Sequence, residues 1–153
     1  MKLAPNFSLK ELTASQTAER LNIKNEPDQQ QLVNLVHLCT HVLQPVREHY
    51  GKVVTVSSGL RVLKLNKAIG SSDKSQHVLG QACDFEIYGL DNHLVAQFIA
   101  EKLDYDKLIL EFYSPPNGGW IHVSYDMHNN RKEIMTASRD SDGKVHYNTG
   151  FNV

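Results

Sequence analysis

The chain has little cysteine, with only Cys39 and Cys83 among its 153 residues. They lie far apart in the sequence and do not form a paired metal-binding motif. A disulfide between them is one alternative. Cysteine is nevertheless among the most buried residue types, which favours two inert thiols in the core.

The chain also lacks a long apolar run and a dominant charge. No stretch approaches the roughly 18 apolar residues of a membrane span, and residues 1–10 contain no apolar signal core or cleavage site. Sixteen basic and seventeen acidic residues give a net charge of −1, which provides no overall field for nucleic acid or an anionic membrane. We therefore expect a protein that is made in the cytoplasm without a signal peptide, binds no nucleic acid and does not insert into membranes. We also expect it to be a monomer.

Helix signals occur in the first half and near the middle of the chain. Ser8 and Glu11 have capping-box spacing, which predicts a helix from Ser8 to about Arg20. Asp28 suits the start of a second helix, which Pro45 should kink or shorten. The apolar stripe of that helix is Leu32, Leu35, Val36, Cys39, Val42, Leu43 and Val46. A third helix should follow Asp91 and bury Leu94, Val95, Phe98, Ile99 and Leu103.

Strand signals dominate the rest of the sequence. A short helix at 61–69 interrupts strands expected at 53–57, 82–88, 107–113, 120–125, 132–137 and 145–147. Early helices followed by strands joined mostly by hairpins predict an α+β fold, with helices packed on a small antiparallel sheet. The length and the absence of a composition break predict one domain over residues 1–153.

Three residues, His77, Asp84 and His122, carry the strongest chemical signal. Two imidazoles and one carboxylate can hold Zn²⁺ and leave its fourth position open, as in catalytic zinc sites. A water on such a metal loses its proton near neutral pH and becomes a nucleophile. Taken alone, a histidine is more often a surface or core residue than a ligand, Asp84 could be a buried hydrogen-bonded carboxylate, and a His and an Asp at this spacing often occur by chance.

Glu111 is the candidate general base. If the strands on either side of Pro116-Asn117 pair about that midpoint, Glu111 falls opposite His122, with Cβ atoms roughly 5 Å apart on one face. Leu110 and Phe112 should then point into the core. A carboxylate in this position can take a proton from water and pass it to a leaving amine, but a one-residue slip would turn it away.

The surrounding motifs together resemble a known family of zinc peptidases. They are Ser75-x-His77-x-x-Gly80-x-Ala82-x-Asp84, preceded by Ser58-Gly59-Leu60-Arg61 and Asn66-x-x-Ile69-Gly70 and followed by Gly119-Trp120-Ile121-His122-Val123. The ordered set resembles the zinc D-alanyl-D-alanine carboxypeptidase and L-alanyl-D-glutamate endopeptidase family (subfamily A of the M15 peptidases), which shares its metal site with hedgehog-type domains. The resemblance covers about residues 6–136, and its opening Asn6–Leu12 looks like that of compact phage and bacterial members. Residues 139–153 lie outside it as a tail without an assigned role.

The resemblance implies that His77, Asp84 and His122 bind zinc and that Arg61 contacts the substrate or the developing oxyanion. Ser75 would orient its loop or contact substrate, and Trp120 would wall the cleft or pack in the core. Gly80 looks structural, through a positive φ or a close backbone approach.

One position departs from some relatives, which carry their catalytic acid three residues before the last His, where this chain has Gly119. Other relatives have a Glu on the preceding strand in a Leu-Ile-x-Glu-Phe context, which agrees with Glu111.

These observations predict a zinc peptidase that cuts peptidoglycan stem peptides at a bond involving D-amino acids, as a carboxypeptidase or an endopeptidase. It would act on the cell wall after release, as an endolysin does, or be carried in a phage particle. One alternative is an inactive zinc-stabilised binding or virion structural module, and another is a hydrolase of some other amide.

Overall fold

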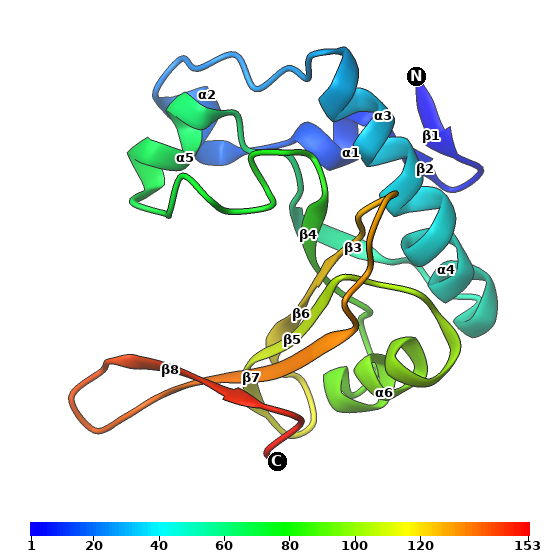
Figure 1. Cartoon of the computed structure of the whole chain (residues 1–153), viewed down its shortest axis with the longest axis vertical. Coiled ribbons are helices and arrows are strands. Elements are labelled where there is room, and N and C mark those ends of the chain that lie inside the picture. The colour runs from blue at the N-terminus through cyan, green and yellow to red at the C-terminus, as the bar shows by residue number, and fades with distance from the viewer.

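The fold is built on one large sheet with helices against one of its faces (Figure 1). The computed structural model describes residues 1–153. The α+β prediction is confirmed. The elements are β1 Lys2–Ala4, β2 Phe7–Ser8, α1 Leu9–Thr13, α2 Gln16–Arg20, α3 Gln29–Leu38, the π-helical η1 Cys39–Leu43, α4 Gln44–Tyr50, β3 Thr55–Ser58, α5 Leu63–Ile69, β4 Ala82–Glu86, α6 Asn92–Lys102, β5 Lys107–Ser114, β6 Gly118–Ser124, β7 Glu133–Arg139 and β8 Val145–Thr149.

The large sheet has the strand order β3-β4-β6-β5-β7-β8, and β1 and β2 form a separate pair. Every pair in the large sheet is antiparallel except β5 with β7, which run parallel. The parallel pair was not predicted. It arises because β4 already occupies the outer edge of β6, so β7 adds to the free edge of β5, where Lys107 pairs with Glu133 at the start of both strands.

The core lies between the sheet and the helices α3, η1, α4 and α6. Leu108 and Leu110 of β5 are fully buried in one cluster with Leu35 of α3 and Ile99 of α6. Successive strand residues point to opposite faces, so Ile109 and Glu111 of β5 lie on the other face. No helix in the structure is both long enough and apolar enough to cross a membrane.

The first predicted helix is two helices. Ser8 and Glu11 form the expected capping box at the start of α1, but the chain turns extended at Ala14. The Ser15 side chain then accepts a hydrogen bond from the Ala18 N–H and caps α2. A second N-cap residue inside an apparently continuous pattern therefore ends the first helix early.

The helix that follows Asp28 begins where predicted, but Pro45 does not shorten it. Asp28 and Gln31 form a capping box. The helical segments continue to Tyr50 and end at the cap residue Gly51, which has a φ of 61°. The π-helical η1 ends at Leu43, two residues before Pro45. Proline cannot donate to the preceding turn, and the wider turn accommodates it without ending the helix. Two residues predicted to be buried, Val36 and Leu94, are instead exposed.

Both cysteines are reduced and buried, as the favoured interpretation predicted. Burial raises the pKa of the Cys39 thiol to about 12 and that of the Cys83 thiol well above its ordinary value. Neither thiol therefore ionises near neutral pH, which makes both unreactive.

Residues 139–153 form an ordered part of the sheet. β8 pairs with β7 in a hairpin that projects from the body of the molecule (Figure 1). At its base, Thr136 Oγ1 donates to the Gly150 carbonyl at 2.6 Å and accepts from the Asn152 N–H at 3.0 Å. The Phe151 ring packs edge-on against His93 of α6, with centroids 5.4 Å apart.

Candidate metal centre

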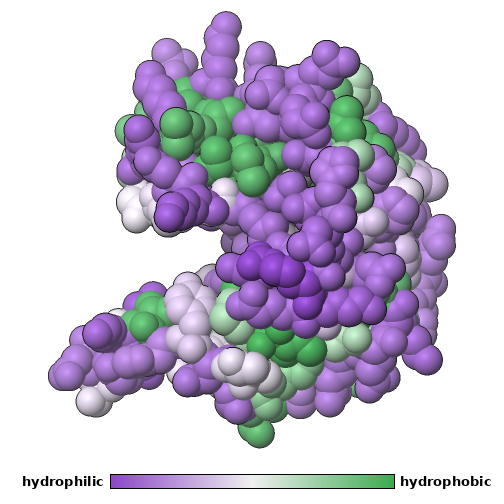
Figure 2. Space-filling model, in the orientation of Figure 1, coloured by the Kyte–Doolittle hydropathy of each residue, from purple (hydrophilic) through white to green (hydrophobic).

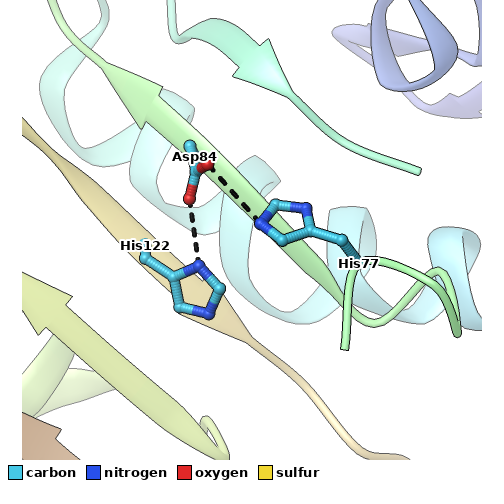
Figure 3. Close-up of side chains that lie close together, drawn as sticks. All are labelled: His77, Asp84 and His122. Atoms are coloured by element: carbon cyan, nitrogen blue, oxygen red, sulfur yellow. Dashed lines mark hydrogen bonds and ion pairs between the residues drawn. The ribbon is translucent and has the colours of Figure 1, made fainter. Parts of the chain in front are cut away.

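His77, Asp84 and His122 come together on the sheet face opposite the core (Figure 3). Asp84 of β4 and His122 of β6 are direct cross-strand partners, and His77 lies in the turn that leads into β4. One potential ligand atom from each residue lies within 4.8 Å of the other two. The structure therefore places the three predicted ligands in one group.

Hydrogen bonds fix which atoms of this group are available. His77 Nδ1 lies 2.7 Å from the Gly59 carbonyl, which can only accept, so Nδ1 donates this hydrogen bond and Nε2 points toward Asp84. Nε2 lies 3.5 Å from Asp84 Oδ2, and His122 Nδ1 lies 3.0 Å from Asp84 Oδ1. Metal-binding histidines characteristically donate their other N–H to a carbonyl or carboxylate in this way.

Asp84 is held in its charged form. Burial raises the pKa of its carboxyl, but hydrogen bonds from His122 and His77 outweigh burial, and the pKa lies well below its ordinary value. Two imidazole nitrogens and one carboxylate oxygen, all largely buried, suit a divalent metal of the zinc type.

The turn that carries His77 is shaped by close backbone contacts. Ser75 Oγ accepts a hydrogen bond from the His77 N–H at 3.3 Å. Gly80 has a φ of +73°, and a Cβ there would lie 2.7 Å from the Gln31 carbonyl oxygen. Only glycine fits this approach, which confirms the structural role predicted for Gly80.

A buried carboxylate, Asp106, connects the same turn to Arg131 in the segment that leads into β7. It accepts one hydrogen bond from Gln76 Nε2 at 2.9 Å and two from the Arg131 guanidinium, both at 2.8 Å. Arg131 holds the pKa of Asp106 down at about 2. Because Gln76 precedes His77, this network supports the position of the metal-binding turn.

Replacing Asp106 with alanine should lower the free energy of unfolding by about 2 kcal/mol at neutral pH, because hydrogen bonds to a charged, buried group are lost. The folded pKa is depressed, so this contribution is complete above the unfolded pKa of about 4 and disappears as the pH falls toward 2. Urea unfolding from pH 7 down to pH 2.5 measures both effects. Asp104→Ala, which removes only an exposed ion pair with Lys132, is the control and should cost at most about 1 kcal/mol. A difference between wild type and Asp106→Ala that does not change with pH would contradict this assignment.

The register predicted for β5 and β6 is wrong by two residues. Ile109 pairs with His122, and Glu111 pairs with Trp120. The hairpin is irregular between Glu111 and Ser114, where Phe112 has a φ of 53° and Gly119 a φ of 76°. A shift of two residues preserves the alternation of faces, so Glu111 still lies on the face of His122.

Phe112 does not point into the core as predicted. Its positive φ turns the ring toward Trp120, with centroids 5.3 Å apart, and the Arg139 guanidinium lies 4.8 Å from the ring centroid. The irregularity that shifts the register therefore also moves this aromatic side chain out of the core.

Glu111 and Arg61 share the surroundings of the metal centre. Burial, and then the negative charge of Asp84, raise the pKa of Glu111. Burial lowers the pKa of Arg61, while Asp84 and Glu111 oppose that effect. The Trp120 indole N–H lies close enough to favour the charged form of Glu111, yet it is buried without a hydrogen-bond partner of good geometry.

These side chains line one open cleft of about 680 Å³. In Figure 2 the molecule is hollowed between the region of α2 and α5 and the projecting β7–β8 hairpin. All seven predicted site residues line the cleft, and so do residues that were not predicted from the sequence: Ser71, Ser72, Lys74, Gln76, Lys107, Ile109, Glu133, Met135 and Tyr147. Lys107 and Ile109 could have been found from their alternation with Glu111 along β5. The β7 and β8 residues could not, because their pairing is long-range.

A sequence model of the family described as peptidase M15 matches residues 5–124. The chain belongs to the peptidase M15 family. The resemblance found in the sequence is thus confirmed at the level of M15. No individual curated protein matches the chain. Members of the family are metal-dependent peptidases, so the candidate site is that of a metallopeptidase. The matched region contains the metal centre, Arg61, Glu111 and Trp120 but ends before β7.

Proposed function

We propose that this M15 metallopeptidase uses zinc to hydrolyse the peptide stems of bacterial peptidoglycan at a bond involving a D-amino acid. The observation that carries the proposal is the arrangement of His77, Asp84 and His122 in one cleft with Glu111 and Arg61. This arrangement combines a metal-binding group with a carboxylate and a cation on the accessible face of the sheet.

The metal would be held by His77 Nε2, an oxygen of Asp84 and His122 Nδ1, the atoms that converge in the structure. Zinc bound there supplies a Lewis acid that polarises the scissile carbonyl and acidifies a water molecule. The hydrogen bond from His77 Nδ1 to the Gly59 carbonyl orients the ring so that Nε2 points toward Asp84.

Glu111 would move the proton. Its raised pKa makes its carboxylate a stronger base than an ordinary glutamate, which suits general base catalysis near neutral pH. It would take a proton from the attacking water and deliver that proton to the nitrogen of the leaving amine as the peptide bond breaks.

Two buried donors are available to hold the peptide. Arg61 Nε and Trp120 Nε1 are buried without a hydrogen-bond partner of good geometry, and both residues line the cleft. A buried donor without a partner costs free energy, and a substrate carbonyl, carboxylate or oxyanion would satisfy it. Ser75 already accepts from the His77 N–H, which supports a role in orienting the turn.

A digest of purified peptidoglycan and of the synthetic stem L-Ala-γ-D-Glu-L-Lys-D-Ala-D-Ala tests this proposal. We expect new amino groups, with products identified by mass spectrometry. Release of free D-Ala would identify a carboxypeptidase, and a new N-terminus on D-Glu would identify an endopeptidase. Zinc binding without cleavage of any stem bond would overturn the proposal and favour a zinc-stabilised binding or virion module. Cleavage of other amides alone would identify a different hydrolase.

The proposed setting is an endolysin-like monomer that reaches the wall after release from the cell, or a domain carried in a phage particle. Clearing of cell-wall suspensions by protein added from outside supports this setting. Activity on soluble stems with none on intact walls would count against it.

A further inference from the structure

We propose that the β7–β8 hairpin forms a substrate subsite of the cleft, in which Tyr147 contacts the peptide stem beside Glu111. This inference rests on the proposed function and adds a specificity-determining residue to it. Both strands lie beyond residues 5–124, the region that matches the family. The subsite is therefore a feature of this chain outside the matched part of the fold.

Strand pairing places Tyr147 on the cleft face. Trp120 pairs with Glu111, Glu111 with Ala137, and Ala137 with Tyr147, so one row crosses four strands. Directly paired residues lie on the same face of a sheet. Ala137, between Glu111 and Tyr147 in this row, is buried and contributes only a methyl group, and both of these neighbours line the cleft.

The adjacent row supplies an apolar floor. His122 pairs with Ile109, and Ile109 pairs with Met135. Both apolar side chains line the cleft, as Tyr147 does. The subsite therefore offers an apolar surface next to the metal centre, bordered by an aromatic ring that carries a hydroxyl.

The Tyr147 side chain has the chemistry of a donor to substrate. Tyr147 is 58% exposed and lines the cleft. Burial of part of the side chain, and then the charges of Glu111 and Asp84, raise the pKa of the phenol. The hydroxyl therefore stays protonated and can donate to a peptide carbonyl, while the ring and Met135 contact a small apolar side chain such as that of alanine.

The hairpin holds Tyr147 in place at both ends. At the tip, Asp140 accepts hydrogen bonds from the backbone N–H groups of Asp142 and Lys144, at 2.9 and 3.0 Å, and lies 2.7 Å from His146 Nε2. At the base, Thr136 bonds to the Gly150 carbonyl. A hairpin that is already ordered loses little conformational freedom when a peptide binds.

The test uses Trp120, the single tryptophan of the chain, whose fluorescence reports occupancy of the cleft that it lines. The zinc-loaded full chain, carrying Glu111→Gln to prevent turnover, is titrated with the synthetic pentapeptide stem. Tyr147→Phe and Tyr147→Ala are compared in this background. Asn148→Ala is the matched control, because Asn148 is exposed on β8 and points to the opposite face.

We expect Tyr147→Phe to weaken binding about fivefold, as expected for one hydrogen bond, and Tyr147→Ala to weaken it at least about tenfold, because the apolar contact of the ring is also lost. Asn148→Ala should bind like the parent. Binding by the parent with equal affinities for Tyr147→Ala and Asn148→Ala would overturn the subsite and leave the proposed function intact. No fluorescence response in the parent, together with no stem hydrolysis by wild type, would overturn the proposed substrate and the subsite with it.

Discussion

Glu111→Gln should lower kcat for stem-peptide hydrolysis by about 10²- to 10⁴-fold, the usual contribution of a general base, while the protein keeps its zinc. Glutamine preserves the size of the side chain and can still accept a hydrogen bond through Oε1, but it cannot take up the proton of the attacking water. Glu111 also lies two residues along β5 from Ile109, the partner of His122, so its replacement leaves the three metal-binding side chains in place. Steady-state kinetics with the pentapeptide, and zinc content after dialysis, measure the two quantities on one preparation.

The matched control is Glu101→Gln on the exposed side of α6, which should change neither quantity. Wild-type kcat in Glu111→Gln with full zinc content would assign the base to another group. If Glu111→Gln loses both its zinc and its activity, Glu111 maintains the metal centre.

Asp84→Ala should weaken zinc binding by about 100-fold or more, because even residues outside the ligand set change metal affinity by 10- to 100-fold. Asp84 is the only carboxylate of the group, and it bonds to both imidazoles. Without it, the two histidines lose their shared partner and the site loses its negative charge. Hydrolysis should fall to background.

Calorimetric titration of chelator-treated protein with zinc measures this effect. Thermal unfolding provides a second measurement, because a ligand that binds only the folded state raises Tm: zinc should raise the Tm of wild type but not that of Asp84→Ala. The exposed Asp104→Ala variant is the control and should bind zinc normally. Wild-type affinity and activity in Asp84→Ala would place the functional metal elsewhere.

The grouping of His77, Asp84 and His122 was predictable because the ordered motifs that resemble the peptidase family contain all three residues. His77 and Asp84 flank a short turn, and Asp84 alternates with the buried Cys83 and Phe85 along β4. Strand alternation alone therefore fixes the face on which Asp84 lies. Glu111 was placed on the correct face even though its partner was wrong, since a register error of two residues does not change the face.

The remaining features depend on contacts between distant segments. No local pattern indicates that Gly80 packs against the Gln31 carbonyl, or that β7 runs parallel to β5. That parallel pairing brings Met135 and Tyr147 to the cleft. The wider π turn before Pro45 likewise lets the helix continue past a proline, which helix propensity alone does not predict.

A zinc titration of chelator-treated wild-type protein, with hydrolysis of the pentapeptide stem followed at each addition, tests the metal-dependent site most directly. We predict no activity without metal, a linear rise with added zinc, and a plateau at one zinc ion per chain, with no activity at any zinc concentration in Asp84→Ala. Full activity in the metal-free protein, or a plateau that Asp84→Ala reproduces, would show that His77, Asp84 and His122 do not form the catalytic metal centre.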